Sequence, residues 1–122
     1  MQAMESLIDA AWERRAELDA AQVERELRPA VERVMDALEA GTLRVAEPVD
    51  GDWRVHQWIK KAVLLYFRIN ANRAMDGGPM TAFDKVPLRF ADADEAALRA
   101  TGARVVPGAF VRRGAHVGKD AV

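Results

Sequence analysis

Apolar residues recur at steps of three and four along the first half of the chain, the spacing of an amphipathic helix. Over residues 4–18, charged side chains such as Glu13 and Glu17 fall on the side opposite this apolar stripe. The pattern predicts a helix over residues 4–18. Trp12 lies within the stripe, so we interpret it as a core residue rather than a ligand-stacking one.

A second helical stripe is interrupted by a proline. Its apolar positions are Val23, Leu27, Val31, Val34 and Leu38. Proline is tolerated in the first turn of a helix and damaging deeper in it, so Pro29 should lie in a first turn. The regular helix is therefore predicted to begin near Arg28, with residues 21–27 forming a separate or kinked turn. Gly41 follows, where a left-handed C-cap is expected.

Residues 56–71 form the most apolar segment, and the apolar stripe there is wide. A helix that is apolar around so much of its surface should be buried on several sides. We therefore predict that this helix is the centre of an N-terminal bundle. Lys60 and Lys61 within it could bind an anion, but a solvated face is the simpler interpretation.

Shorter elements are predicted between and after these helices. Residues 43–46 and 53–55 alternate around an Asp-Gly pair, which indicates a hairpin that should lie against the helices. Residues 70–80 contain Asp76-Gly77-Gly78-Pro79 and are predicted to be a loop. Residues 83–90 have extended character. A short helix over residues 93–101 should start with a capping box at Asp92 and end at Gly102.

The last eighteen residues repeat with a period of six. Valine opens each repeat at Val105, Val111 and Val117, and alanine follows four places later each time. This period fits neither a helix nor an alternating strand, but it fits a hexapeptide-repeat β-solenoid. The alternative is an ordinary strand and loop in which valine and alanine recur by chance.

A single solenoid turn cannot bury its apolar face alone. The sequence is therefore expected to be the front part, or a truncated piece, of a longer protein. The predicted fold class is α+β: an N-terminal helical domain with a small hairpin over residues 1–102, leading over residues 103–122 into the first turn of a left-handed parallel β-helix.

Composition and charge exclude several classes of function. The net charge of −1 gives no reason to propose nucleic acid as a partner, and no apolar run reaches the roughly 18–20 residues of a membrane span. Cysteine is absent, which excludes disulfides and thiolate metal sites and fits a cytoplasmic protein. Residues 103–122 are basic, which suits an anionic ligand, although a solvated basic surface is the simpler explanation.

Motifs for known chemistry are missing from the sequence: no glycine-rich phosphate loop, paired-His zinc motif or nucleophile elbow is present. His56 and His116 are far apart along the chain and lack ligand-spaced partners, so neither is proposed as catalytic. The many carboxylates fall on predicted solvent faces. We predict no metal site and no catalytic residue within this chain.

Several stretches resemble the N-terminal part of tetrahydrodipicolinate N-succinyltransferase, a family of bacterial lysine-pathway enzymes. They are spread in order over essentially all 122 residues. They are Glu13-Arg14-Arg15-Ala16-Glu17, Leu43-Arg44-Val45-Ala46-Glu47, His56-Gln57-Trp58, Lys60-Lys61-Ala62-Val63-Leu64-Leu65, Phe67-Arg68-Ile69-Asn70, Phe83-Asp84-Lys85-Val86-Pro87 and Arg104-Val105-Val106-Pro107. The combination is specific, whereas any one stretch alone would be weak.

The resemblance implies a homotrimer with active sites between neighbouring β-helices. Such enzymes transfer succinyl from the co-substrate succinyl-CoA to the amino group of ring-opened tetrahydrodipicolinate, with no covalently bound cofactor. It also implies that Arg104 binds the dicarboxylate substrate, since a guanidinium can hold a carboxylate through two hydrogen bonds. An interface or surface ion pair is the alternative role for Arg104. The general base and the CoA-binding residues would lie in later coils, so the 122 residues alone should be inactive.

Two other classes remain open from the sequence. One is a non-catalytic helical module for assembly or binding, with an incidental basic tail. The other is a different hexapeptide acyltransferase with a helical cap, such as a serine acetyltransferase relative.

Overall fold

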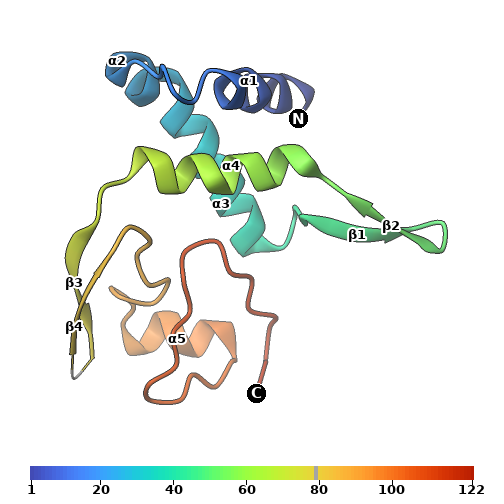
Figure 1. Ribbon diagram of the computed structural model, residues 1–122. Coiled ribbons are helices and arrows are strands. Elements are labelled where there is room, and N and C mark those ends of the chain that lie inside the picture. The colour runs from blue at the N-terminus through green and yellow to red at the C-terminus, as the bar shows by residue number, and fades with distance from the viewer. Residues whose placement is uncertain (79) are drawn as a thin grey trace.

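Three helices form the body of the computed structural model, which describes residues 1–78 and 80–122. They are α1 (Gln2–Glu13), α3 (Arg28–Ala40) and α4 (Gln57–Ile69). Helix α4 contacts both α1 and α3 and crosses α3 near the middle of the molecule (Figure 1). Its buried residues are Trp58, Ile59, Ala62, Leu65 and Tyr66. The prediction that this segment is the centre of the bundle is confirmed.

Helix α1 ends at Glu13, five residues before the predicted end. Arg15 provides the physical reason, because its Nη1 donates to the carbonyl of Trp12 at 2.8 Å and its backbone N–H donates to the same oxygen. These donors satisfy a terminal carbonyl that would otherwise need a further helical turn. Trp12 is half-buried and packs against the core, as predicted, with the Arg15 guanidinium 4.3 Å from its ring centroid.

Pro29 divides the next helical stretch as predicted. A short helix α2 (Ala20–Gln22) leads into a π-helical turn η1 (Val23–Leu27), and α3 begins at Arg28. A proline removes one backbone N–H, and its ring clashes with the carbonyl four residues earlier. The helical hydrogen bonds before Pro29 therefore span five residues instead of four, as in the bond from the Arg28 N–H to the Val23 carbonyl. Gly41 ends α3 in the left-handed conformation, with φ of 74°.

The first hairpin pairs β1 (Ala46–Val49) with β2 (Asp52–Val55). Asp50 and Gly51 both have positive φ, at 52° and 83°, and form a two-residue turn that is tighter than the six-residue loop expected from the sequence. The expectation that the hairpin lies against the helices is wrong: it projects away from them (Figure 1). Trp53 on this hairpin is 68% exposed.

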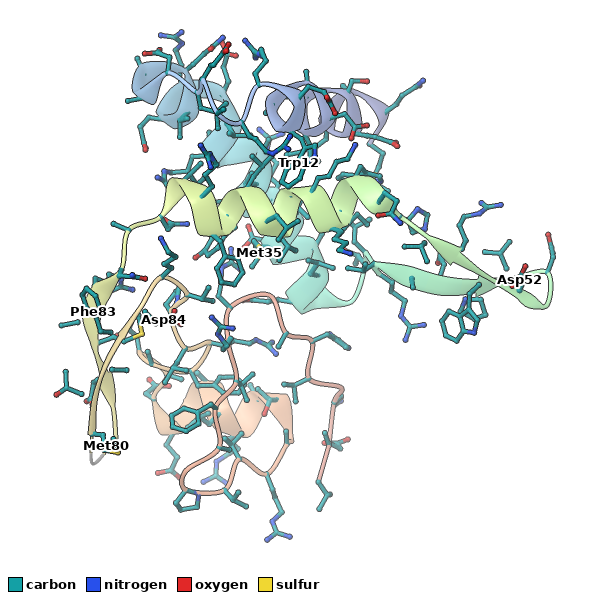
Figure 2. The ribbon with its side chains drawn as sticks, in the orientation of Figure 1. Trp12, Met35, Asp52, Met80, Phe83 and Asp84 are labelled. Atoms are coloured by element: carbon teal, nitrogen blue, oxygen red, sulfur yellow. The ribbon has the colours of Figure 1, made fainter. Side chains whose placement is uncertain are left out.

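A second hairpin occupies the predicted loop. Residues 70–80 contribute β3 (Arg73–Gly77), which pairs antiparallel with β4 (Met80–Asp84), so the loop prediction is wrong. The turn signal was correctly placed, since Asp76 accepts a hydrogen bond from the Gly78 N–H at 3.0 Å; Pro79 lies outside the described residues. Figure 2 shows Met80 and Phe83, both exposed, on the outside of this hairpin.

The predicted extended segment 83–90 forms strand only at its first two residues, after which Leu88 makes a single bridge to Arg112. Helix α5 (Glu95–Thr101) then starts two residues later than expected. Its N-cap is Asp94, whose carboxylate accepts from the Ala97 N–H at 2.8 Å, so the predicted capping box at Asp92 does not form. Gly102 ends α5 in the left-handed conformation, as predicted.

The coarse fold class, α+β, is therefore confirmed. Residues 103–122, all of which are described, contain no β-strand beyond the bridge at Arg112, so the structure does not display a β-helix. Across the described residues, each helix is too short or too polar to traverse a lipid bilayer.

Candidate functional site

Residues 104–121 form a closed lap beside α5 (Figure 1). Its backbone turns three times, through hydrogen bonds from Ala109 N to Val106 O at 3.1 Å, from Ala115 N to Arg112 O at 3.1 Å and from Ala121 N to Gly118 O at 3.2 Å. The third residue of each turn has positive φ, as in a type II turn. These residues are Gly108, Gly114 and Asp120, with φ of 86°, 93° and 60°. The six-residue period of the sequence is thus a six-residue period of backbone conformation.

The two ends of the lap meet each other. The N–H of Arg104 donates to the carbonyl of Ala121 at 2.9 Å, and the N–H of Asp120 donates to the carbonyl of Thr101 at 3.1 Å. The Asp120 side chain lies directly against Gly102. The chain therefore returns to its starting point after one lap, and hydrogen bonds join the first residues of the lap to the last ones.

Arg104 lies at the start of this lap. Its side chain is exposed and forms no hydrogen bond or ion pair with the other described residues. A pocket of about 300 Å³ is lined by its chain neighbours Ala103 and Val105 together with Glu95, Leu98 and Arg99 of α5, and Arg104 itself does not line it. An exposed guanidinium without an internal partner keeps its N–H donors available for an anionic group such as a carboxylate.

The other two arginines of the lap are engaged within the chain. Nη2 of Arg112 is 3.0 Å from Oδ2 of Asp84, and its guanidinium lies 5.5 Å from the ring centroid of Phe67. Arg113 contacts carboxylates of α3. The basic character of residues 103–122 is therefore partly neutralised, and within the described structure Arg104 and Lys119 are the cations of the lap that lack an ion pair.

Three carboxylates of α3 surround the Arg113 guanidinium. Nη2 lies 2.9 Å from Oε2 of Glu32 and 2.6 Å from Oδ1 of Asp36, and Nη1 lies 2.8 Å from Oε1 of Glu39. Burial lowers the pKa of Arg113, but hydrogen bonds to Glu39, Glu32 and Asp36 outweigh it, so the pKa lies above its usual range. The prediction that the carboxylates face solvent is wrong for Glu32 and Glu39, which are partly buried, whereas Asp36 is exposed as predicted. Their i, i+4, i+7 spacing, which places them on one helix face, was the signal in the sequence.

Each histidine pairs with an oxygen atom of a glutamate rather than with the other histidine. Nε2 of His56 lies 2.7 Å from Oε1 of Glu47, across the base of the first hairpin. Nδ1 of His116 lies 2.6 Å from the carbonyl of Glu39 at the end of α3. In the described part of the chain, no group of three or more potential metal-ligating side chains comes together.

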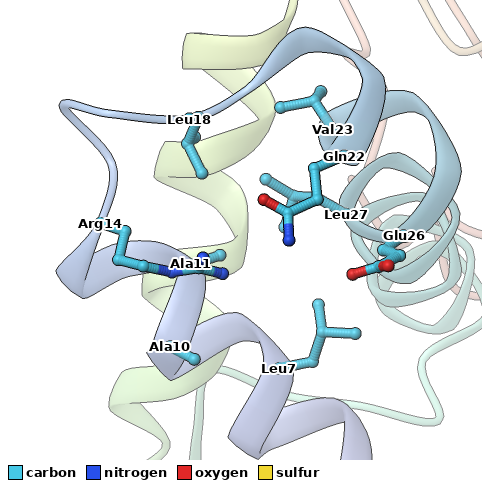
Figure 3. Close-up of a pocket in the computed structure, with 9 residues that line it drawn as sticks. All are labelled: Leu7, Ala10, Ala11, Arg14, Leu18, Gln22, Val23, Glu26 and Leu27. Atoms are coloured by element: carbon cyan, nitrogen blue, oxygen red, sulfur yellow. The ribbon is translucent and has the colours of Figure 1, made fainter.

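A further pocket lies between α1 and the π-helical turn (Figure 3). Its volume is about 70 Å³, and it is lined by Leu7, Ala10, Ala11, Arg14, Leu18, Gln22, Val23, Glu26 and Leu27. Figure 3 shows Leu7, Leu18 and Leu27 directed toward it. This volume is well below that of a typical ligand pocket, which indicates a packing gap beside the widened helical turn and not a substrate site.

The helical body defines the class of protein to which this chain belongs. Residues 3–69, more than half of the chain, match the family model described as tetrahydrodipicolinate N-succinyltransferase N-terminal. The chain therefore belongs to the family of tetrahydrodipicolinate N-succinyltransferase N-terminal domains. The matched range covers the first hairpin and the three helices of the body, apart from Gln2 at the start of α1.

Curated relatives that match the whole of this chain carry the name 2,3,4,5-tetrahydropyridine-2,6-dicarboxylate N-succinyltransferase. The protein of Salmonella heidelberg is 52% identical over 122 residues, which is all of this chain and 44% of the relative. The protein of Citrobacter koseri is 51% identical over the same extent. The chain thus spans less than half the length of the curated relatives it matches, and the match continues through the lap that follows the helical body.

Proposed function

We propose that these 122 residues are the N-terminal segment of an N-succinyltransferase. The whole enzyme transfers succinyl from succinyl-CoA to the amino group of ring-opened tetrahydrodipicolinate, in the pathway to diaminopimelate and lysine. The amine attacks the thioester carbonyl, an amide C–N bond forms, and the C–S bond breaks to release CoA. A base takes the proton that the amine loses.

The observation that carries this proposal is the identity of 52% along the entire chain to a relative with that name. The structure adds support at the lap. Three turns at six-residue spacing and the Arg104–Ala121 hydrogen bond fit the first coil of a hexapeptide solenoid, whose strands need neighbouring coils for pairing. In the proposal, residues 1–102 are the helical domain and residues 103–122 open a left-handed β-helix.

Arg104 is the substrate-binding residue of the proposal. Its guanidinium is exposed and, among the described residues, unpaired, so it can offer two parallel N–H donors to one carboxylate of the dicarboxylate. No catalytic role is proposed for the residues of this chain. The base and the CoA-binding groups are assigned to the part of the relatives' length that these residues do not span, and the working enzyme is proposed to be a cytoplasmic homotrimer.

The test compares two proteins in one assay. One is the full-length protein expressed from the gene that encodes this chain, called the gene product below, and the other is the 122-residue chain. Each is mixed with succinyl-CoA and tetrahydrodipicolinate, and CoA release is followed with a thiol reagent. We expect substrate-dependent release from the gene product and none from the 122-residue chain. No release from the gene product, or release only with another amine acceptor such as serine, would overturn the proposal.

A non-catalytic helical module is the second candidate, favoured by the lack of a paired acid and base near Arg104 in the described residues. It predicts that the gene product binds partners but releases no CoA from any acyl donor. The same assay separates the two candidates.

A further inference from the structure

Polar contacts in the middle of the lap, rather than burial of its apolar residues, hold the lap to the helical body. Of the three valines that open the repeats, Val105 is 38% exposed, and Val111 and Val117 are only half-buried. Such positions gain little from removal of apolar area from water. Polar contacts must therefore supply most of the attachment.

These polar contacts concentrate on residues 113–116. Oε1 of Glu39 accepts both Nη1 of Arg113 at 2.8 Å and the backbone N–H of Gly114 at 2.9 Å. Nδ1 of His116 lies 2.6 Å from the carbonyl of Glu39 near the end of α3. Arg89, in the segment before α5, links α3 and the lap, because its Nε lies 3.9 Å from Oε2 of Glu39 and its Nη1 donates to the carbonyl of Ala115 at 3.0 Å. Glu39 thus holds a side chain and a backbone group of the same turn.

Arg113 is the residue on which this attachment depends most. Its side chain is 17% exposed and neutralises part of the charge of Glu32, Asp36 and Glu39 on one face of α3. Without it, three carboxylates on successive turns would repel one another across that face. Its pKa lies above its usual range, so it stays charged at every working pH.

The ends of the lap contact α5 and each other, not α3. The N–H of Asp120 donates to the carbonyl of Thr101 in α5, and the N–H of Arg104 donates to the carbonyl of Ala121, which belongs to the last turn of the same lap. The Arg104 backbone is therefore positioned within the unit of α5 and the lap, and the turn that contains Arg113 places this unit on α3.

We propose that Arg113 is a positioning residue for the transferase: it fixes the lap on α3 and so places the Arg104 guanidinium against the substrate dicarboxylate. This inference rests on the proposed function, because it presumes the dicarboxylate as the ligand of Arg104. Arg113 itself is enclosed by α3 carboxylates and touches no substrate.

Arg113→Met in the whole enzyme tests the kinetic part. We expect KM for the dicarboxylate to rise about tenfold, the effect of losing one hydrogen bond between charged groups, while kcat and KM for succinyl-CoA stay within about twofold. Arg113→Lys should recover part of the loss, since lysine keeps the charge but not the forked geometry. Lys119→Met removes the same charge from the same lap without breaking a contact of the described residues, and should leave all constants unchanged.

Amide hydrogen exchange in the 122-residue chain tests the structural part without substrate. Arg113→Met should speed exchange at the Arg104 N–H, whereas Lys119→Met should not, and the core amides of α4 should stay protected in both. If Arg113→Met unfolds the chain, exchange at the Arg104 N–H is compared between Arg113→Lys and Lys119→Met instead. If the unaltered enzyme transfers no succinyl group, the proposed function fails, and exchange alone decides the positioning role.

Unchanged KM in Arg113→Met, or unchanged exchange at Arg104, would overturn the proposal. An equal loss in kcat and in both KM values would also overturn it, because that pattern indicates general damage to the fold.

Discussion

The N–H of Arg104 donates to the carbonyl of Ala121 at 2.9 Å, although almost three six-residue repeats separate these residues along the chain. Arg104 is thus held at its backbone while its guanidinium remains exposed. A residue with an ordered backbone and a side chain free of internal partners is suited to bind a ligand with little reorganisation.

Arg104→Lys tests the substrate role directly. Lysine keeps the positive charge but cannot form two parallel hydrogen bonds to one carboxylate, so KM for the dicarboxylate should rise about tenfold, with use of succinyl-CoA changed less than about twofold. Steady-state kinetics of the whole enzyme measure both. Arg25→Lys, at an exposed position on the π-helical turn, is the matched control and should behave like the unaltered enzyme. Normal use of both substrates by Arg104→Lys would show that Arg104 has no substrate role.

Gly114→Ala tests the corner of the lap. Gly114 has φ of 93°, and a β-carbon there would lie 2.7 Å from Cε of Met35, a buried residue of α3 labelled in Figure 2. The strained backbone and this contact should cost about 1–3 kcal/mol. Gly118→Ala is the control, since its φ is not positive and a β-carbon there meets open space, so its effect should stay within about 0.5 kcal/mol. Urea unfolding followed by circular dichroism compares them, and equal midpoints would contradict the assignment.

The two tryptophans at 53 and 58 should differ sharply in their effect on stability. Trp58 is 7% exposed within the core cluster, so Trp58→Ala should cost about 3–5 kcal/mol. Trp53 is exposed on the hairpin that projects from the body, so Trp53→Ala should change the free energy of unfolding by less than about 0.5 kcal/mol. Thermal and urea unfolding of the 122-residue chain measure both. A large loss from Trp53→Ala would mean that the hairpin packs on the body in solution.

Asp84 should make stability depend on pH at the acid end. The backbone N–H of Lys85, then the Arg112 guanidinium, lower the pKa of Asp84 against the opposing effect of burial. A carboxyl group with a lowered folded-state pKa stabilises the fold above its usual value of 3.8, and this contribution is lost as pH falls through the lowered pKa. Asp84→Asn should therefore reduce the free energy of unfolding at pH 7, and the difference should vanish at pH values below the lowered pKa.

Urea unfolding at a series of pH values measures this difference. Asp76→Asn is the control, because its carboxylate accepts a local hydrogen bond but has no ion pair among the described residues. A constant difference between Asp84→Asn and the unaltered chain at all pH values would contradict the assignment.

Local sequence signals predicted the helical body well. Gly41 and Gly102 both adopt the left-handed conformation expected of them, and Pro29 forces the break before α3. These features depend on one residue and its immediate neighbours, which is the information that a single sequence contains.

Other features depend on long-range contacts or on specific caps and could not be predicted in the same way. Arg15 ends α1 by capping the Trp12 carbonyl, and Asp94 takes the N-cap that was expected at Asp92. Contacts between Arg113 and α3 join residues about eighty positions apart, which no local pattern reveals. The six-residue spacing of Gly102, Gly108 and Gly114 is present in the sequence and marks the turns, which the valine and alanine repeat alone does not locate.

The equal spacing of Gly102, Gly108, Gly114 and Asp120 restricts how this stretch of chain can vary in length. Insertion or deletion of one to five residues would move the glycines and Asp120 away from the left-handed corners that they occupy and shift every later corner out of step. Gain or loss of six residues keeps all corners occupied as before. Insertions and deletions that this stretch tolerates should therefore be six residues long or a multiple of six.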